Sequence, residues 1–311
     1  MRTKFIMALA ACTALLPAAA VAAPPSVLAT IKPIHSLAAA VMQGVAEPVL
    51  LIQGARSEHS YAFRPSDGDK IRHAQIVFEI GPDLETSLER PLASLAPHAH
   101  IVPLEQAEGV HRLRARRGGL WENVNDSDEG PYDPHIWLDP ENAIAMTRAI
   151  AAALTRLDPA NGPIYKVNRD KEIASLSSLE AELQKELVPL RARKYIVFHD
   201  AYRYFEFRFG LNPTGAVTVA PDRPVGPRRI EALRRTILEG GIDCVFREPQ
   251  FPPALVKTLT DGSRARIGVL DPLGADIEPG PGLYPTLLRA LAASLTACMP
   301  IRTKKDWQGR H

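Results

Sequence analysis

Three histidines stand in surroundings that suit metal binding. His59 lies in GARSEHSYAFRPSD, His135 lies in the proline-bounded stretch DPHIWLDP, and His199 directly follows the apolar run YIVF. Asp271 ends the apolar run IGVL in the same way. Ligands of α/β proteins bind at the carboxyl ends of parallel strands, so we expect these side chains to meet there. Three imidazoles and one carboxylate suit a tetrahedral Zn²⁺ site, whereas Mg²⁺ and Ca²⁺ prefer oxygen ligands alone.

The elements that must position these residues follow an alternating β–α pattern. Any one such histidine is more often an ordinary hydrogen-bonded residue, but ligands spread over both halves of the chain indicate a site between two domains. Short apolar runs predict strands at 27–31, 48–52, 76–80, 100–104, 195–198, 216–219, 244–246 and 267–270. Helical spacing occurs at 37–43, 66–73, 84–95, 228–239, 253–260 and 283–296. The fold class is therefore α/β, with two domains that each contain a mainly parallel sheet flanked by helices.

A long amphipathic stretch separates the two halves. Apolar residues recur there at three- and four-residue spacing: Ile164, Val167, Ile173, Leu176, Leu179, Leu183 and Leu187. The spacing predicts one connecting helix over 158–190, roughly 45 Å long, which would join the domains stiffly. The alternative is a helical hairpin broken near Ser177 and Ser178. The predicted domains are then 23–157 and 191–311.

Residues 109–134 have the composition of a surface loop. The segment begins Arg-rich, as HRLRARRGG, and continues acidic and polar, as ENVNDSDEG. It shows no hydrophobic periodicity and contains several Gly, Asn and Asp residues, so we expect it to be mobile.

The first 22 residues read as a secretory signal peptide. Arg2 and Lys4 precede a short Ala-rich apolar run that ends in the small-residue pattern Ala20-Val21-Ala22. Removing them leaves 35 basic and 35 acidic side chains, from 37 and 35 in the whole chain. A neutral protein lacks the basic surface of a general nucleic-acid binder or of a polybasic membrane-surface protein. A lipid anchor at Cys12, in the lipobox-like Leu9-Ala10-Ala11-Cys12, is the less favoured alternative.

Two cysteines remain in the exported chain. An even number in an exported protein suggests a disulfide between Cys244 and Cys298, and two buried thiols are the alternative.

Five motifs together resemble one family. They are GARSEHSYAFRPSD, DPHIWLDP, VFHDAYRYFEFRFGL, CVFREPQF and LDPLG, and they extend in order over nearly the whole mature chain. They resemble the zinc-binding solute-binding proteins of bacterial zinc-uptake ABC transporters, a cluster that also includes manganese-binding relatives. The resemblance implies two α/β domains joined by one rigid helix, with the metal in the interdomain cleft. It implies a periplasmic carrier with Zn²⁺ as its transported ligand and a membrane permease as its partner; we expect a monomer.

The resemblance also assigns individual residues. His59, His135 and His199 match the three histidine ligands of the family, and His199 favours zinc because manganese-binding relatives generally have Glu there. The fourth ligand stays open between Asp271, Glu58 and water. Glu248 is expected behind the ligands or in a structural role. The two cysteines match a disulfide of zinc-type members. The His-rich loop common in those members is missing here, because GGLWENVNDSDEG contains no histidine.

Three other functions fit parts of the pattern. A manganese carrier would share the fold. A secreted zinc hydrolase would use three protein ligands and a water, but the sequence has no H-E-x-x-H pair and no motif that places a general base. A metal-dependent surface adhesin could also share the fold, although the chain has no adhesive repeats. We therefore expect a carrier and not an enzyme.

Overall fold

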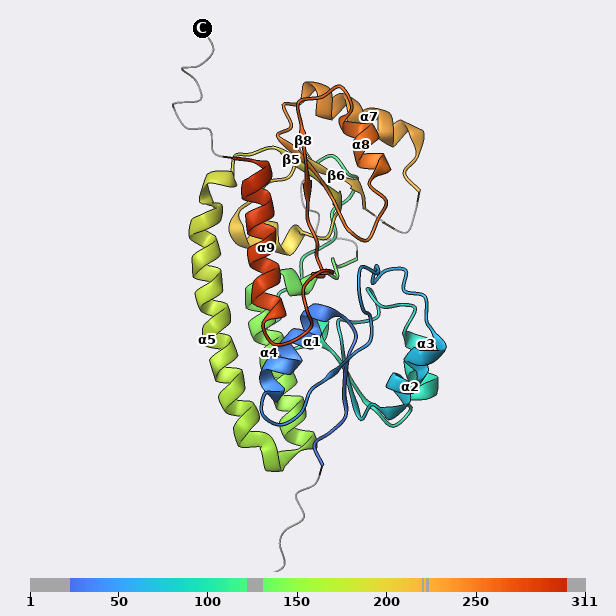
Figure 1. Cartoon of the computed structure of the whole chain (residues 1–311), viewed down its shortest axis with the longest axis vertical. Helices are drawn as coiled ribbons and strands as arrows, with labels where there is room; N and C mark the ends of the chain where they lie inside the picture. Colours follow the sequence, from blue (N-terminus) through green and yellow to red (C-terminus); the bar gives the residue numbers. More distant parts are fainter. Residues whose placement is uncertain (1–22, 122–130, 220, 222–223, 301–311) are drawn as a thin grey trace, which may run out of the picture.

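The chain folds into two lobes, each built on a four-stranded parallel sheet (Figure 1). The computed structural model describes residues 23–121, 131–219, 221 and 224–300. The first sheet has the order β2-β1-β3-β4, with β1 at Val27–Ala29, β2 at Val49–Leu50, β3 at Ile76–Glu79 and β4 at His100–Pro103. The second has the order β6-β5-β7-β8, with β5 at Tyr195–His199, β6 at Gly215–Thr218, β7 at Cys244–Arg247 and β8 at Arg266–Val269. Every predicted strand is present, and the fold class is confirmed.

Helices cover both sheets. The first lobe contains α1 (Lys32–Met42), α2 (Pro65–His73), α3 (Glu89–Leu95) and α4 (Pro140–Leu157), and the second contains α6 (Arg203–Phe209), α7 (Pro227–Glu239) and α8 (Ala254–Thr260).

Neither α4 nor α6 was predicted from the sequence. Yet α4 has clear start signals, since Asp139 accepts a hydrogen bond from Glu141 N and Pro140 is the first helical residue. Helix α6 ends at Gly210, whose φ of 71° suits glycine.

The connecting helix α5 (Gly162–Leu187) is continuous over 26 residues. At 1.5 Å per residue it is about 39 Å long, and in Figure 1 it runs along both lobes. Its buried leucines, Leu176, Leu179, Leu183 and Leu187, lie on one face at the predicted spacing. A hairpin broken near Ser177 is therefore wrong.

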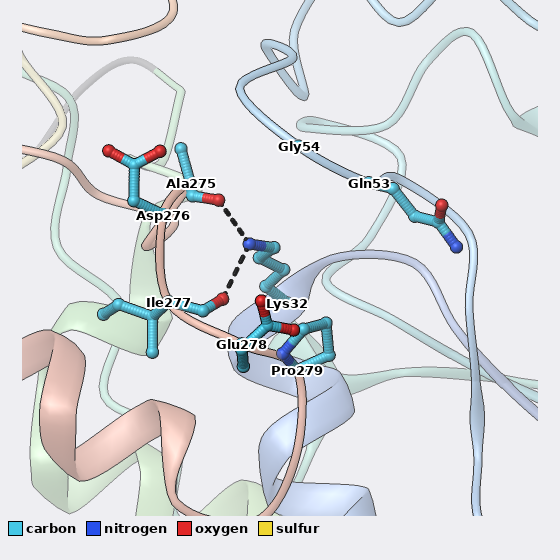
Figure 2. A pocket seen from close by; sticks show the side chains of 8 residues that line it. All are labelled: Lys32, Gln53, Gly54, Ala275, Asp276, Ile277, Glu278 and Pro279. Atoms are coloured by element: carbon cyan, nitrogen blue, oxygen red, sulfur yellow. Dashed lines mark hydrogen bonds between the residues drawn. The ribbon is translucent and has the colours of Figure 1, made fainter.

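Helix α9 (Leu283–Cys298) confirms the helix predicted over 283–296. The sequence did not predict that this helix is a second long connection between the lobes. Before α9, the chain leaves β8 and crosses to the first lobe. There the ammonium of Lys32, at the start of α1, donates to the backbone oxygens of Gly274, Ala275 and Ile277, at 2.9, 2.6 and 2.9 Å. Figure 2 shows two of these bonds beside a pocket of about 520 Å³. From this anchor α9 returns to the second lobe beside α5 (Figure 1).

The end of α9 is fixed covalently to the second sheet. Cys298 forms a disulfide with Cys244, the first residue of β7, which confirms the predicted bridge. One apolar core runs through both lobes, from Val27 in β1 to Met299 after α9. No helix in the described ranges is long and apolar enough to span a membrane.

The predicted loop 109–134 is attached to the second lobe in its described part. Gly119 O accepts from Ala216 N at 2.9 Å, and Trp121 N donates to Thr214 O at 3.0 Å. Its two arms also bond to each other, with Ala115 N donating to Pro131 O at 2.9 Å. Residues 122–130 lie outside the described residues, as do the predicted signal peptide and Cys12, and the mobility of the loop and the domain boundaries stay predictions.

Candidate metal centre

His199 and Glu248 meet because they end neighbouring parallel strands. His199 is the last residue of β5, and Glu248 directly follows β7. The sheet order reverses between these strands, which is where open α/β sheets bind ligands. Nδ1 of His199 lies 2.8 Å from Oε2 of Glu248, while Tyr202 donates to Oε1 at 3.1 Å. A carboxylate can only accept, so Nδ1 carries the proton and Nε2 presents its lone pair.

His135 is held in the same manner by Asp133, two residues earlier. Oδ1 of Asp133 accepts from the backbone N–H of His135 at 2.9 Å and from its Nδ1 at 2.7 Å. The hydroxyl of Tyr204, on α6, donates to the backbone oxygen of Asp133 at 2.8 Å. The second lobe therefore helps to seat a ligand of the first, and Nε2 of His135 is again unprotonated.

Glu58 and His59 come from the segment between β2 and α2. The side chain of Glu58 is 2% exposed, and its Oε1 has no hydrogen-bond partner among the described residues. That oxygen lies 3.8 Å from Nε2 of His59 and 4.0 Å from Nε2 of His135. A buried, unpartnered carboxylate oxygen is costly unless a cation or proton joins it.

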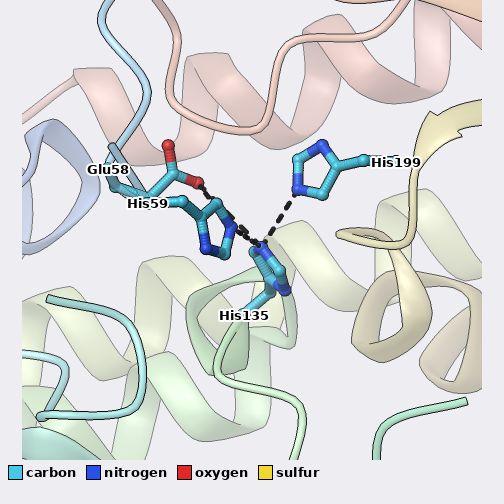
Figure 3. Close-up of side chains that lie close together, drawn as sticks. All are labelled: Glu58, His59, His135 and His199. Carbon is cyan, nitrogen blue, oxygen red and sulfur yellow. Dashed lines mark hydrogen bonds and ion pairs between the residues drawn. The ribbon is translucent and has the colours of Figure 1, made fainter. Parts of the chain in front are cut away.

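The four side chains converge on one point (Figure 3). Nε2 of His135 lies 3.0 Å from Nε2 of His59 and 3.2 Å from Nε2 of His199. All four ligand atoms lie within 4.8 Å of one another. Around a zinc ion with bonds of about 2.0–2.1 Å, tetrahedral ligand atoms are about 3.3 Å apart. Lone pairs directed at each other over such distances repel unless a cation lies between them, so the donor set fits Zn²⁺.

Burial tunes the proton affinity of this group. It lowers the pKa of His59 to about 2 and the pKa of His135 well below its usual value, and the neighbouring imidazoles add to both shifts. Burial raises the pKa of Glu58 to about 7. For His199, burial lowers the pKa, but Glu248 and other acids raise it more, so the net shift is upward. His59 and His135 are thus ready to bind a metal near neutral pH, whereas the raised pKa values of Glu58 and His199 mean that protons compete with a metal at these two residues.

Asp271 lies outside this group of four. Its Oδ1 accepts from the backbone N–H groups of Leu273 and Gly274, both at 3.0 Å, and from Nε2 of Gln250 at 2.8 Å. Its Oδ2 accepts from the backbone N–H of Ala275. The carboxylate is committed to the turn after β8, and the structure brings Glu58, not Asp271, to the histidines.

Asp133 and Tyr204 were not singled out from the sequence. The signal for Asp133 is its place two residues before a candidate ligand, where an acceptor can reach the Nδ1–H of that histidine. No local signal marks Tyr204, because it reaches Asp133 over 71 residues of sequence. Glu248 does lie behind a ligand, as the sequence suggested.

Comparison with known proteins identifies the family. The model of the family described as "Zinc-uptake complex component A periplasmic" matches residues 27–298. The chain belongs to the ZnuA family. The high-affinity zinc uptake system protein ZnuA of Brucella abortus (strain 2308) is 42% identical over 305 residues, covering 88% of this chain and 91% of the relative. ZnuA of Yersinia pestis is 34% identical over 293 residues, again covering 88% and 91%.

A solved structure of a ZnuA protein has the same fold. It superposes with a TM-score of 0.77 at 25% sequence identity, covering 89% of this chain and 99% of the other. The family resemblance read from the sequence is thereby confirmed, and the ZnuA family is one of zinc-binding periplasmic solute-binding proteins. The manganese-carrier and zinc-hydrolase alternatives are not favoured.

Proposed function

We propose that this chain captures Zn²⁺ in the periplasm through Glu58, His59, His135 and His199, and delivers it to the membrane permease of an ABC-type zinc importer. The observation that carries the proposal is the convergence of three Nε2 lone pairs, two of them fixed by a carboxylate on Nδ1. Zn²⁺ is the cargo, and the side chains of Glu58, His135 and His199 are almost fully buried. Membership of the ZnuA family supports both the cargo and the transport role.

The same geometry argues against catalysis. Catalytic zinc usually keeps one position open for a water, with three protein ligands around it. Here a carboxylate oxygen of Glu58, whose side chain is 2% exposed, lies within 4.8 Å of the three imidazole nitrogens and would be the fourth protein ligand. We infer that the site stores an ion and performs no hydrolysis. A panel of peptide and ester substrates incubated with the zinc-loaded protein should show no turnover.

The decisive test of the site is isothermal titration of zinc into His199→Ala. Loss of a ligand should weaken binding by more than the about 10- to 100-fold typical of residues behind a ligand. The matched control is His98→Ala, which removes an exposed imidazole and should bind as the wild type does. Unchanged affinity in His199→Ala would sink the assignment. Stronger binding of Mn²⁺ than Zn²⁺ in direct competition would overturn the choice of cargo.

Export and solution state belong to the same proposal. We infer that residues 1–22 direct export and are removed, that Cys12 leaves with them without being lipidated, and that the mature protein is a monomer that does not bind nucleic acid. The near-equal numbers of basic and acidic side chains support the last point. Intact mass of the periplasmic protein should correspond to a chain that starts at Ala23, and a larger mass with an acyl group would contradict it.

A further inference from the structure

Residues 113–121, here called the clasp, cross from the first lobe to the second close to the metal centre. At one end the backbone N–H of Leu113 donates to the hydroxyl of Tyr204 at 2.9 Å, the same hydroxyl that seats Asp133. At the other end Gly119 and Trp121 bond to the β6 edge of the second sheet. None of the four candidate ligands lies in this segment.

The approach of the clasp to β6 is close enough to require glycine. A Cβ atom built on Gly215, the first residue of β6, would lie 2.2 Å from the backbone oxygen of Gly119. Backbone atoms on both sides cannot yield by that amount. The clasp can therefore pack this closely against β6 only because residue 215 is a glycine.

The clasp places Arg116 between two buried acids. One guanidinium nitrogen, Nη1, lies 2.9 Å from Oδ1 of Asp200 and 2.7 Å from Oε2 of Glu206. The exposed fractions of the three side chains are 15%, 8% and 2%. The ring of Trp121 covers the guanidinium, with its centroid 4.4 Å from Cζ. Two carboxylates in such a place need compensating positive charge. Arg116 bonds to both of them, and Arg203 also stabilises the charged form of Asp200.

Both acids belong to the frame that holds His199. Asp200 is the next residue in the chain and begins the turn from β5 to α6, where the backbone N–H of Ala201 donates to His199 O at 2.9 Å. Glu206 lies on α6, and its Oε1 accepts from the hydroxyl of Tyr195, at the start of β5, at 3.1 Å. Arg116 thus joins the turn that follows His199 to the helix α6 that comes after it.

We propose that Arg116 is a positioning residue of the metal centre, which acts through Asp200 and Glu206 to hold His199 in its ligating position. The inference rests on the proposed zinc site and extends it to the clasp. Arg116 touches none of the four ligands, so its effect on the metal is transmitted by the turn.

Two physical effects of Arg116 on zinc have opposite signs. A cation close to the site repels Zn²⁺, so removing it would tighten binding if charge alone mattered. Positioning acts in the other direction, because without Arg116 the two acids repel each other and the turn after His199 loses its brace. The sign of the change in affinity therefore separates the two roles.

The test compares wild type with Arg116→Gln and Arg116→Lys. Zinc affinity is measured by competition with a chromophoric chelator, and the ligand-field absorption of Co²⁺ in the same site reports ligand geometry. We expect Arg116→Gln to weaken zinc binding about 10- to 100-fold and to change the Co²⁺ spectrum, with Arg116→Lys recovering most of both. Thermal unfolding of the metal-free variants measures any loss of stability separately.

The matched control is Arg193→Gln. Arg193 pairs with Asp243 at 2.8 Å at the amino ends of β5 and β7, away from His199. This variant should keep the wild-type zinc affinity and Co²⁺ spectrum even where its unfolding temperature falls. A purely structural role for Arg116 predicts the same pattern for Arg116→Gln, and that result, or tighter zinc binding, would overturn the inference.

Two further variants decide the matter if Arg116→Gln does not fold. Asp200→Asn and Glu206→Gln preserve the packing and remove one partner each. Loss of a nearby acid weakens zinc binding by charge alone, so the Co²⁺ spectrum decides, and both variants must alter it. Wild-type behaviour in both would overturn the inference. Failure of the wild type itself to bind zinc would instead refute the proposed function, so the two failures are distinguishable.

Discussion

Nδ1 of His199 and Oε2 of Glu248 lie 2.8 Å apart, both side chains almost fully buried. The pair fixes the tautomer of His199, makes Nε2 a better electron donor and orients the ring. It arises because β5 and β7 are neighbours in the second sheet although 49 residues separate the two side chains. Several expected outcomes depend on contacts of this kind.

Replacing Glu248 by Gln should weaken zinc binding about 10- to 100-fold without removing a ligand. A neutral amide accepts the Nδ1–H bond more weakly than a carboxylate and gives the imidazole less electron density. Competition titration against a chelator of known affinity measures the change. Glu231→Gln, on the exposed face of α7, is the control and should leave affinity unaltered. Equal affinities for the two variants would contradict the role of Glu248.

Glu58→Gln and Asp271→Asn should have opposite signatures. The first removes an anionic ligand and should reduce zinc affinity with little effect on the unfolding of the metal-free protein. The second leaves the four-residue group intact but weakens a cap on three backbone N–H groups, so we expect a loss of about 1–3 kcal/mol in the free energy of unfolding. Chelator competition and urea unfolding on both variants measure the contrast. If Asp271→Asn lost zinc binding and Glu58→Gln retained it, Asp271 and not Glu58 would be the fourth ligand.

Zinc affinity should fall as the pH falls below about 7. Metal binds only deprotonated ligands, and burial raises the pKa of Glu58 to about 7 while acids beside His199 bring its pKa above the usual value. Zinc must displace these protons, and each one costs up to about tenfold in affinity per pH unit. His59, with its pKa lowered to about 2, contributes nothing in this range. Affinities measured between about pH 8 and about pH 5.5 should show this slope, and Glu58→Gln should flatten it. A wild-type zinc affinity that does not change with pH over this range would contradict the competition between zinc and protons.

Replacing both Cys244 and Cys298 by Ala should destabilise the protein without affecting the metal. The bridge closes a loop over 54 residues of sequence, which the chain-entropy view values at about 4 kcal/mol. Cys244 begins β7, whereas Glu248 follows its far end, so the disulfide lies at the edge of the sheet away from the zinc site. Guanidinium unfolding of the metal-free protein measures the loss. A drop in zinc affinity at a temperature where the variant is folded would show that the bridge also orders the site.

The sequence predicts the sheets well because their strands are short apolar runs between turn residues. It also marks His199, because the end of a strand is a local feature. His59 and His135 lie in connecting segments, after β2 and before α4, and the family resemblance grouped them with His199. Asp271 looked equally suitable, but an acid followed within four residues by free backbone N–H groups tends to cap its own turn. Whether Asp271 is a metal ligand or a cap can be decided only once the position of Glu58 is known, and that position depends on the tertiary structure.

The course of α9 could not be read from its pattern. Its leucines show that one face is buried, but not which surface buries it. That is decided by distant contacts, such as the bond from the backbone N–H of Tyr284 to the hydroxyl of Ser36, 248 residues earlier. The partners of Lys32 could not be predicted either. Its ammonium donates to three backbone oxygens of a segment more than 240 residues later in the chain.

Helices α5 and α9 both run from the first lobe to the second, so two long helices join the lobes side by side (Figure 1). Bending one helix requires the other to slide or stretch, and α9 is fastened at Cys298 and close to Ser36. We therefore expect little swing of the lobes between the loaded and the empty carrier, with changes confined to the local surface around the segment that carries Glu58 and His59. Solution scattering should give nearly equal radii of gyration for the loaded and empty carrier.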